Sequence, residues 1–542
     1  MIMPDPRAPR CQRFVRPSCG VVRDDGPVRS ERSSASLALA GVVTGVAGVV
    51  TSQATVWALG ATNGPVVAVA SAVRDFTPGW LAHRLIKSVG HLDKPLLVSG
   101  TVVVLVLICA ATGLLSARHP LVPDVVFFAL AVVGLLAVLR LKDSGLASGL
   151  AVVVGLVTWI VVLRFLTAPL LTEPRTTVVR PAQDDAPTPA SSRRVFLARA
   201  AGVALVVAFA GAAGRFASRS RRQVEQARKL LRLPVTRGSV PTGADLGVPG
   251  IAPWRTPNDD FYLIHTALVP PSISPKDWRL RIHGMVDNEL TFTYDDLVRR
   301  QLTEAWVTLC CVSNEVGGDL VGNAYWSGVL VRDLLYGAGV HSDADAVLQT
   351  SDDGWTCGTP LTALTDDRNA MLAVAMNGQP LPIEHGFPVR TIVPGLYGYV
   401  SATKWVVDLE VTRFDKFDAY WTDRGWSEKG PVKTQSRIDL PRDGSSVAAG
   451  TVRVGGSAWA QHTGIDRVQY QVDGGPWRDA TLGGVPDLDT WVQWSGTVDV
   501  DRGDHVLVVR ATDKSGYTQT SVRTDVIPNG ATGWHSVSFN AH

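Results

Sequence analysis

Five apolar runs dominate the first part of this 542-residue chain and constrain its fold more than any other feature. They cover residues 36–60, 95–117, 122–139, 144–166 and 200–214. A helix of about 20 apolar residues crosses the hydrocarbon core of a bilayer and satisfies its own backbone hydrogen bonds there. The first four runs have about that length, whereas the fifth is shorter and less apolar. The sequence therefore predicts a transmembrane region of about five helices over residues 35–216.

Charge places the polar half of the chain across the membrane from the N-terminus. Residues 1–34 carry seven arginines and no apolar periodicity, so the positive-inside rule puts this basic tail in the cytoplasm. Residues 61–94 mix charged and apolar side chains, as in an amphipathic segment at the membrane surface. An odd number of crossings then brings the rest of the chain outside. We expect a multi-pass protein of the cell membrane whose polar domains lie on the extracytoplasmic side.

The last apolar run is preceded by a short motif with its own meaning. Residues 192–197 read Ser-Arg-Arg-Val-Phe-Leu, which resembles a twin-arginine export signal ahead of a modest apolar segment. That route moves folded proteins, typically ones that already hold a cofactor. An ordinary final span with positive flanking charge is the alternative, and both interpretations predict the same topology.

Beyond the membrane region, the patterning changes twice. Residues 217–250 are basic and then rich in Pro and Gly, which is typical of a linker. Residues 251–428 mix strand and helix patterns, including an alternating strand at 278–284, a helix opened by Thr293 or Tyr294, a strand at 305–309 and a helix at 331–336. Residues 429–542 form short alternating strands separated by turns, at 451–458, 465–472, 491–500, 505–512 and 520–526. This spacing predicts an immunoglobulin-like β-sandwich.

Two adjacent cysteines carry the strongest chemical signal. Cys310 and Cys311 end a strand-like run, and Asn314 follows in a loop that contains two glycines. The chain has no second Cys-x-x-Cys and no histidine pair at zinc spacing, which argues against a four-ligand zinc site. The cysteines are either small buried hydrophobes, or one of them is a nucleophile or the single protein ligand of a soft metal.

Other ligand classes find less support. A net charge of only +3 leaves no basic footprint for nucleic acid. Haem ligation would need histidines inside paired spans, but the candidates in the membrane region lie in or beside loops, and solvated positions at the interface are the better interpretation. These candidates are His83, His91 and His119.

Three stretches of the middle domain resemble the sulfite oxidase family of molybdopterin enzymes. They are residues 258–265, the thiol loop 308–318 and the basic stretch 385–405. The resemblance runs from about residue 255 to 540, because members of that family also end in an immunoglobulin-like dimerisation domain. It implies a multi-domain architecture: N-terminal transmembrane helices, an α+β molybdopterin-binding catalytic domain, and a β-sandwich that mediates homodimerisation.

The resemblance also assigns site residues. Cys311 would be the catalytic thiolate ligand of molybdenum, because the family motif places the cysteine three residues before Asn314. Cys310 would point to the opposite face of the strand. Arg390 and Lys404 suit contacts to the phosphate of the cofactor. The full expected cofactor-binding set is Phe261, Tyr262, His265, Cys311, Asn314, Asp353, His385, Arg390, Ser401 and Lys404.

The activity implied is oxygen-atom transfer on a small-molecule substrate, with electrons exchanged with a separate carrier, either a cytochrome or a quinone-linked membrane partner. Two departures from the family bear on the substrate. Ile264 and Glu315 stand where sulfite-oxidising members have arginines, so the substrate pocket loses positive charge. The alternative is that His265 or Arg368 replaces that charge. We therefore expect sulfite to be a poor substrate. The alternatives are a reductase of S-oxides or N-oxides, such as methionine sulfoxide, and a non-catalytic membrane-tethered binding module.

Overall fold

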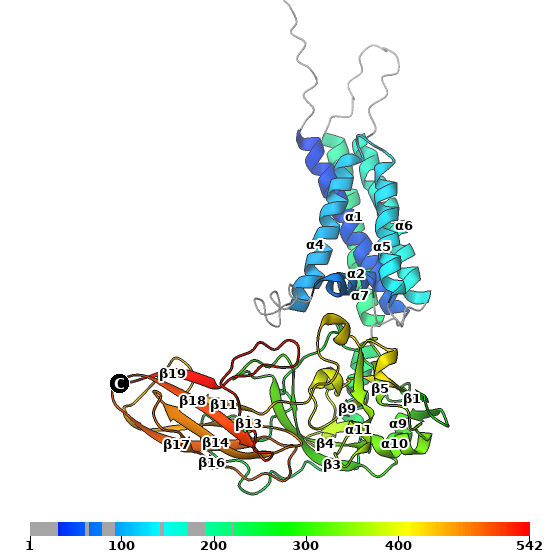
Figure 1. The fold of residues 1–542 in the computed structure, drawn as a ribbon. Helices are drawn as coiled ribbons and strands as arrows, with labels where there is room; N and C mark the ends of the chain where they lie inside the picture. The colour runs from blue at the N-terminus through cyan, green and yellow to red at the C-terminus, as the bar shows by residue number, and fades with distance from the viewer. Residues whose placement is uncertain (1–30, 60–63, 79–92, 141–145, 172–189, 218–219) are drawn as a thin grey trace, which may run out of the picture.

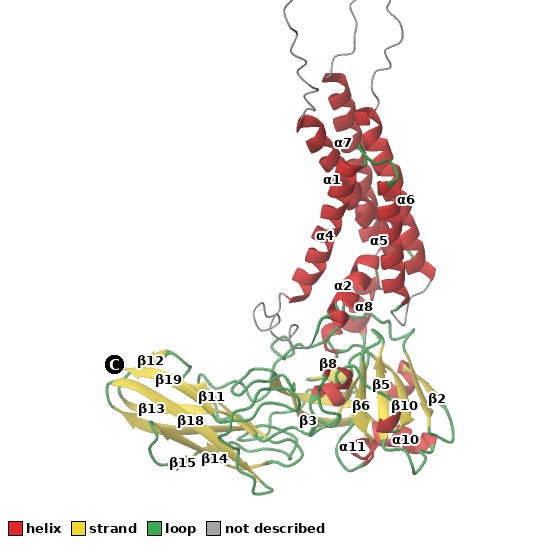
Figure 2. Cartoon of the chain, turned by 45° about the horizontal axis from the view of Figure 1, so that its top comes forward, coloured by secondary structure: helices red, strands yellow, loops and turns green. Residues whose placement is uncertain are grey.

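The computed structural model describes residues 31–59, 64–78, 93–140, 146–171, 190–217 and 220–542. A helical bundle adjoins an α+β domain, and a β-sandwich lies beside that domain (Figures 1 and 2). Several features of the sequence lie outside the described residues: nearly all of the basic tail, most of the segment between the last two apolar runs, and the residues Cys11, Cys19, His83 and His91. His119 is described, and it is exposed in a loop between two helices.

Five helices of the bundle are long and apolar enough to cross a membrane, as the sequence predicts. They are α1 (Glu31–Ala58), α4 (Asp93–Leu115), α5 (Val122–Leu139), α6 (Leu146–Leu171) and α7 (Ala190–Ala217). The chain passes along the bundle five times, so that the start of α1 and the start of α7 lie at the end remote from the α+β domain (Figure 1). Helices of this length and composition indicate a multi-pass membrane protein.

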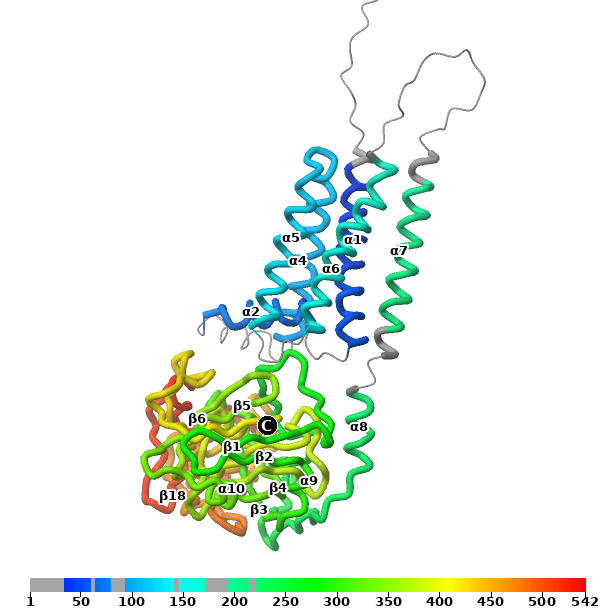
Figure 3. The backbone as a smooth tube through the Cα atoms, turned by 90° about the vertical axis from the view of Figure 1, so that its right-hand side faces the viewer, coloured from blue at the N-terminus to red at the C-terminus, as the bar shows by residue number. Residues whose placement is uncertain are grey.

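A sixth, shorter helix lies across the end of the bundle that faces the α+β domain. This helix, α2 (Pro65–Phe76), is amphipathic and buries Ala68, Ala70 and Ser71. Figure 3 shows it beside the ends of the long helices. It falls within the stretch for which the sequence predicts an amphipathic segment, and its charged C-terminal turn reaches the polar half of the protein.

The segment that follows α7 packs onto the polar domains. Helix α8 (Ser220–Leu230) lies along the α+β domain (Figure 3), where Arg228 donates to the carbonyl of Pro380 at 3.2 Å. Farther along, the Leu246 amide donates to the side-chain oxygen of Gln493 in the sandwich at 2.7 Å. Most of the predicted linker is therefore held against both polar domains.

Two β-sheets and three short helices build the α+β domain. One sheet has the order β2 (Leu290–Thr293), β1 (Arg279–Gly284), β10 (Val406–Thr412), β5 (Ala346–Ser351) and β6 (Thr356–Pro360). The other has the order β3 (Thr303–Cys310), β4 (Val321–Leu330), β7 (Met371–Met376) and β8 (Gln379–Pro380), with β9 (Arg390–Ile392) paired to β7. The helices are α9 (Tyr294–Val298), α10 (Val331–Ala338) and α11 (Leu361–Thr365).

Local sequence accounts for several of these elements. Thr293 caps α9 through a capping box with Asp296, which satisfies amides that the first turn leaves free. Every residue of β7 is buried, because its run of Met, Leu, Ala and Val lies in the interior of the domain. The strands and helices predicted for this domain are confirmed, with ends that differ by a few residues.

Two stacked sheets form the C-terminal sandwich around Trp494, Leu507 and Phe539. One contains β11 (Gln435–Leu440), β13 (Gly450–Trp459), β17 (Val492–Val500) and β16 (Thr481–Leu482). The other contains β12 (Ser445–Val447), β19 (His535–Ala541), β18 (Gly503–Asp513), β14 (Ile465–Val472) and β15 (Arg478–Asp479).

One predicted strand of the sandwich is wrong. Residues 520–526 form a loop with a single bridge between Thr524 and Thr532. This segment alternates in sequence, but Val522 is exposed, so the alternation buries little apolar surface on the sandwich. The last strand of the chain is instead β19, which lies between β12 and β18 and whose Val537 and Phe539 face the core.

The sandwich is fastened to the strand that carries the two cysteines. Trp254 and Trp491 each donate an indole N–H to the backbone carbonyl of the other, at 3.2 and 2.8 Å. On β3, the Thr308 amide donates to the carbonyl of Asp489 at 2.9 Å, and the Thr308 carbonyl accepts from Gln461 at 3.0 Å. The sandwich therefore fixes the position of β3 just before the thiol loop.

Candidate active site

Most of the thiol loop lies in the connection between β3 and β4, residues 311–320, which is closed by hydrogen bonds across its base. The Cys311 amide donates to the carbonyl of Leu320 at 2.9 Å, and the Asn314 amide donates back to the carbonyl of Cys311 at 3.0 Å. The side-chain oxygen of Asn314 accepts from the Leu320 amide at 2.8 Å. Asn314 therefore shapes the loop that presents Cys311.

The two thiols have different surroundings. Cys310 belongs to the same buried cluster as Trp459 of the sandwich, and burial raises the pKa of its thiol well above its usual range. Burial also raises the pKa of the Cys311 thiol, but hydrogen bonds from Ser313 and the charge of Lys404 oppose that shift. Only Cys311 therefore has nearby groups from the loop and the basic stretch that favour a thiolate.

The basic stretch brings three nitrogen-bearing side chains together. His385 ends the 3-10 helix η2 (Ile383–His385). Arg390 is the first residue of β9, and its backbone forms an isolated antiparallel β-bridge with that of Lys404. Arg390 donates to the His385 carbonyl at 3.2 Å, and Lys404 donates to the Glu384 carbonyl at 2.9 Å. A glycine is required at position 386, between His385 and Arg390. Its φ is 110°, and a Cβ there would lie 2.9 Å from the Arg390 side chain.

Arg390 and Lys404 are buried without an ion-pair partner among the described residues. Arg390 is 4% exposed and Lys404 is 9% exposed, and among the described residues no carboxylate forms an ion pair with either one. Arg390 Nε and His385 Nδ1 are buried and have no hydrogen-bond partner within the described part of the chain. A buried cation is costly unless it is paired, so this cluster is suited to an anionic ligand.

Burial and mutual repulsion appear in the acid–base properties of the cluster. Burial lowers the pKa of Arg390 to about 10. Burial, together with the charge of Arg390, lowers the pKa of Lys404 well below its usual range. Burial and the charges of Lys404 and Arg390 lower the pKa of His385 to about 3. An anion bound among these groups would reverse the shifts at Arg390 and Lys404 and stabilise the site.

Aromatic side chains cover the cluster. Phe261 packs edge-on against His385 with ring centroids 5.8 Å apart, and it stacks on Tyr262 at 5.1 Å. Arg390 lies over the ring of Trp326 at 5.2 Å. The charges of Cys311, Cys310 and Arg390 all act on the Tyr262 hydroxyl. The phenol pKa of Tyr262 is raised well above its usual range, chiefly by burial.

The remaining expected site residues are placed less directly. His265 packs edge-on against Trp405 at 5.7 Å, and burial together with the charges of Lys404 and Lys94 lowers its pKa to about 3. Asp353 accepts from the Trp355 amide, and its charge acts on Lys404. The hydroxyl of Ser401 donates to backbone carbonyls of its own turn, the nearer at 2.9 Å.

Sequence reasoning missed several groups at the site. Ser313 hydrogen-bonds the Cys311 thiol, Trp326 lies under Arg390, and Lys94 of α4 contacts His265. The Ser313 signal was present in the motif itself, one residue before Asn314. The Lys94 contact joins residues 171 positions apart, and no local pattern announces it.

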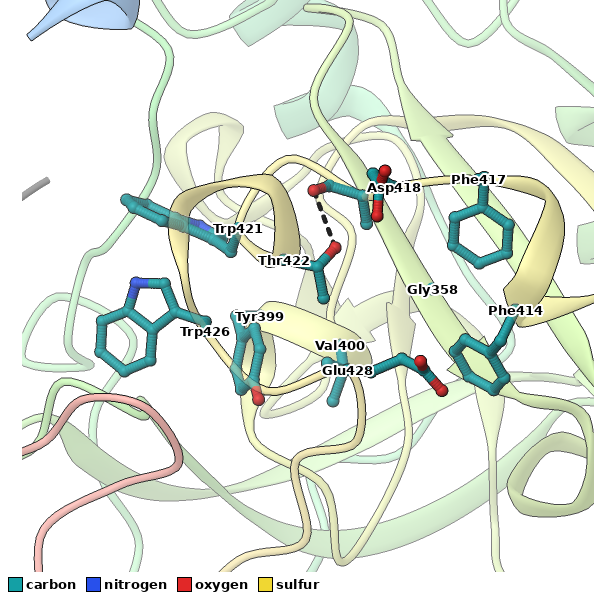
Figure 4. A pocket seen from close by; sticks show the side chains of 11 residues that line it. Gly358, Tyr399, Val400, Phe414, Phe417, Asp418, Trp421, Thr422, Trp426 and Glu428 are labelled. Carbon is teal, nitrogen blue, oxygen red and sulfur yellow. Dashed lines mark hydrogen bonds between the residues drawn. The ribbon is translucent and has the colours of Figure 1, made fainter. Parts of the chain in front are cut away.

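Two results concern metal and cavity. Within the described ranges, no group of three or more His, Cys, Asp or Glu side chains could hold a metal ion. A cavity of about 240 Å³ lies between Gly358, Tyr399 and the aromatic residues of segment 414–428 (Figure 4). None of the expected site residues lines it, and it is therefore separate from the cation cluster.

Comparison with known proteins identifies this arrangement. Residues 266–421 match the family model described as "Oxidoreductase molybdopterin binding domain". The chain is 31% identical over 180 residues to the uncharacterized oxidoreductase YuiH of Bacillus subtilis, a match that covers 33% of this chain and 87% of that protein. The chain belongs to the sulfite oxidase family of molybdopterin-binding oxidoreductases.

The chain is also similar to curated sulfite oxidases and to one solved structure. The chain is 30% identical over 313 residues to human mitochondrial sulfite oxidase, covering 49% of this chain and 57% of that one. It thus spans about half the length of the curated mitochondrial sulfite oxidases it matches. Among solved structures, the sulfane dehydrogenase SoxCD of Paracoccus pantotrophus aligns with a TM-score of 0.48 and 24% identity, over 57% of this chain and 90% of that one.

The residues present fit the molybdenum cofactor that a molybdopterin-binding domain implies. The cluster supplies buried, unpaired cations for a phosphate and a thiol for a soft metal, and both come from elements within or adjoining the matched region.

Proposed function

We propose that this protein is a membrane-anchored oxidoreductase that catalyses oxygen-atom transfer with a molybdenum–molybdopterin cofactor. The observation that carries the proposal is the buried cluster of Arg390, Lys404 and His385, in which neither Arg390 nor Lys404 forms an ion pair among the described residues and the Lys404 charge acts on the Cys311 thiol. Burying an unpaired cation is costly, and an anionic ligand would remove that cost.

Each residue then has a defined task. Cys311 would hold the metal as a thiolate, stabilised by Ser313 and Lys404. Arg390 and Lys404 would bind the phosphate, with His385 donating or accepting beside them according to its tautomer. Phe261 and Tyr262 would exclude water from the pterin. When bound, the cofactor supplies the oxygen-atom transfer and the accompanying two-electron change, while the protein orients it and sets the electrostatics.

Metal analysis of the full chain, purified in detergent, tests this assignment. We expect about one molybdenum and one pterin per chain, as one binding site requires. Protein that folds and remains free of molybdenum when produced in a host that makes the cofactor would favour the alternative, a membrane-tethered binding module without catalysis.

The substrate is proposed to be an uncharged or weakly charged S-oxide, or a related compound, in preference to sulfite. Ile264 and Glu315 are both exposed. Neither supplies positive charge, because one side chain is apolar and the other is acidic. Arg368 is held by the carboxylate of Asp366 at 2.7 Å and by the carbonyl of Pro394. Steady-state assays with a dye acceptor for sulfite and a dye donor for S-oxides decide the direction. A higher kcat/KM for sulfite than for every S-oxide tried would overturn this preference.

Topology and export form a second part of the proposal. The cofactor-binding domain would lie on the extracytoplasmic side, carried there by a twin-arginine signal at the start of α7, and a separate cytochrome or quinone-linked partner would exchange electrons with it. Replacing Arg193 and Arg194 by lysine should leave the polar domains protected from external protease. Normal exposure of those domains in the variant would point instead to an ordinary final span.

Homodimerisation through the sandwich completes the proposal. The domains would divide as residues 1–34, 35–216, 217–250, 251–428 and 429–542. Light scattering of the detergent-solubilised chain should give twice the protein mass of one chain, and removal of residues 430–542 should give one. A truncated protein that remains dimeric would place the interface elsewhere.

A further inference from the structure

The membrane region holds the rim of the candidate site through two cations. Arg74, in the last turn of α2, donates to the carbonyl of Thr266. Lys94, in the first turn of α4, donates to the carbonyl of His265 at 2.6 Å, and its Nζ lies 3.0 Å from the His265 Nδ1. Two consecutive carbonyls of the segment that follows Phe261 and Tyr262 are therefore bound from outside the α+β domain.

A second contact fixes α2 in this place. The Tyr420 hydroxyl donates to the carboxylate of Asp75 at 3.2 Å, and Arg424 lies 3.9 Å from the same carboxylate. Arg424 also lies over the Tyr420 ring at 3.8 Å. The ends of α2 and α4 thus dock on two separate segments of the α+β domain, which limits how far Lys94 can move from His265.

Lys94 is linked to the buried cation cluster through the packed rings of His265 and Trp405. The ring of Trp405 lies 5.7 Å from that of His265, and the Lys404 ammonium lies 5.7 Å from the Trp405 ring centre. The charge of Lys94 acts on both Lys404 and His265. The positive charge at the site therefore comes from two parts of the chain, the basic stretch and the start of a membrane helix.

The contact with Nδ1 also determines what His265 can offer a ligand. An ammonium only donates, so in the tautomer whose Nδ1 accepts from Lys94 the proton resides on Nε2. Without Lys94, Nδ1 would carry the proton and donate to the carbonyl of Ala267, which also lies 3.0 Å away. Nε2 would then become an acceptor and would repel an anion.

We propose that Lys94 is a positioning and anion-binding residue of the cofactor site, so that the membrane region completes the site rather than only anchoring it. This inference rests on the proposed function. Lys94 holds His265 with Nε2 as a donor and adds a third cation beside Arg390 and Lys404. The ligand is an oxyanion group, either the phosphate of the cofactor or an anionic substrate, and two assays distinguish these sources.

Three substitutions in the full chain separate charge from hydrogen bonding. Lys94→Arg keeps both, Lys94→Gln keeps a donor without charge, and Lys94→Met keeps neither. Arg164→Met is the matched control, because Arg164 is a cation of the membrane region whose partner, Asp124 of α5, lies within the bundle at 2.7 Å. Each protein is purified in detergent, and its molybdenum and pterin content is measured after extended dialysis.

If the anion is the cofactor phosphate, Lys94→Met should retain on the order of tenfold less pterin than the parent protein, as expected for the loss of one charge-assisted contact. Lys94→Gln should fall between the two, and Lys94→Arg and Arg164→Met should match the parent. If the anion is the substrate, pterin content should stay constant while the KM for sulfite rises about tenfold and the KM for an uncharged S-oxide does not change.

A Lys94→Met protein that equals the parent in both pterin content and the two KM values would overturn the inference. If that variant does not fold, Lys94→Gln decides, because it retains a donor on a polar side chain without the charge: parent-like values would remove any role for the charge. Parent protein that contains no molybdenum would contradict the proposed function instead, so the two failures are distinguishable.

Discussion

The α+β domain and the C-terminal sandwich treat buried charge in opposite ways. In the sandwich, Arg437 and Asp439 are both nearly buried and form an ion pair at 2.7 Å. In the α+β domain, Arg390 and Lys404 are buried to a similar degree, and no carboxylate in the described part of the chain pairs with them. The sandwich thus pairs this buried arginine with a carboxylate of its own domain. The α+β domain leaves Arg390 and Lys404 without such a pair, as the proposed binding of an anionic cofactor would require.

The largest effect should separate the two cysteines. Cys311→Ser should abolish turnover and molybdenum retention, because a hydroxyl is a poor ligand for a soft metal. Cys310→Ser should retain turnover, since its thiol lies in the same buried cluster as Trp459 and is not the proposed metal ligand. Activity and Mo(V) paramagnetic resonance of both variants check this. Equal loss in both would remove the assignment of Cys311 as the ligand.

Substitution of one arginine in each domain should lower stability in the sandwich but leave it unchanged in the α+β domain. Arg437→Met leaves Asp439 buried without its partner, which should cost about 3 kcal/mol and lower the thermal midpoint by roughly 6–12 °C. Arg390→Met removes an unpaired cation, so the cofactor-free protein should be as stable as the parent while cofactor content falls.

Thermal unfolding of the cofactor-free chains, measured beside their molybdenum content, makes the comparison. A cofactor-free Arg390→Met protein that is destabilised as much as Arg437→Met would mean that Arg390 is neutralised within the protein, contrary to the contrast drawn between the two domains.

A smaller effect should appear in the pH dependence of stability, with opposite signs for two histidines. The pKa of His385 is lowered to about 3 from its ordinary 6.5, so the unfolded chain binds more protons between these values. Its stabilising contribution is full above pH 6.5 and is lost as the pH falls toward 3, at up to about 1.4 kcal/mol per pH unit.

His505 of the sandwich provides the contrast, because its hydrogen bond to Asp473 at 2.7 Å raises its pKa. That contribution is present below pH 6.5 and is lost as the pH rises through the raised value. His385→Gln should flatten the acid limb of the stability curve of the cofactor-free protein, and His505→Gln should flatten the limb above pH 6.5. An unchanged acid limb in His385→Gln would show that His385 is already solvated or paired.

The sequence by itself determined the broad organisation of this protein. Apolar runs of about 20 residues have few alternatives to spanning helices, and the alternation of strands 450–459 and 465–472 needs a sheet with one buried face. The thiol motif and the basic stretch were recognisable because their residues lie close together in the chain. The strand at 520–526 failed because alternation does not say whether a core is present to receive it.

Only the tertiary structure decided how the candidate site is assembled. Asn314 and Ser401 are predicted to contact the cofactor, and the structure adds that their side chains hydrogen-bond the backbone of their own loops. The contact of Lys94 with His265 depends on where a membrane helix ends relative to a domain that begins more than 100 residues later. Periodicity reports which face of an element is buried, whereas partners brought together by packing have no fixed spacing in sequence, and that is why this cation could not be found before the fold was known.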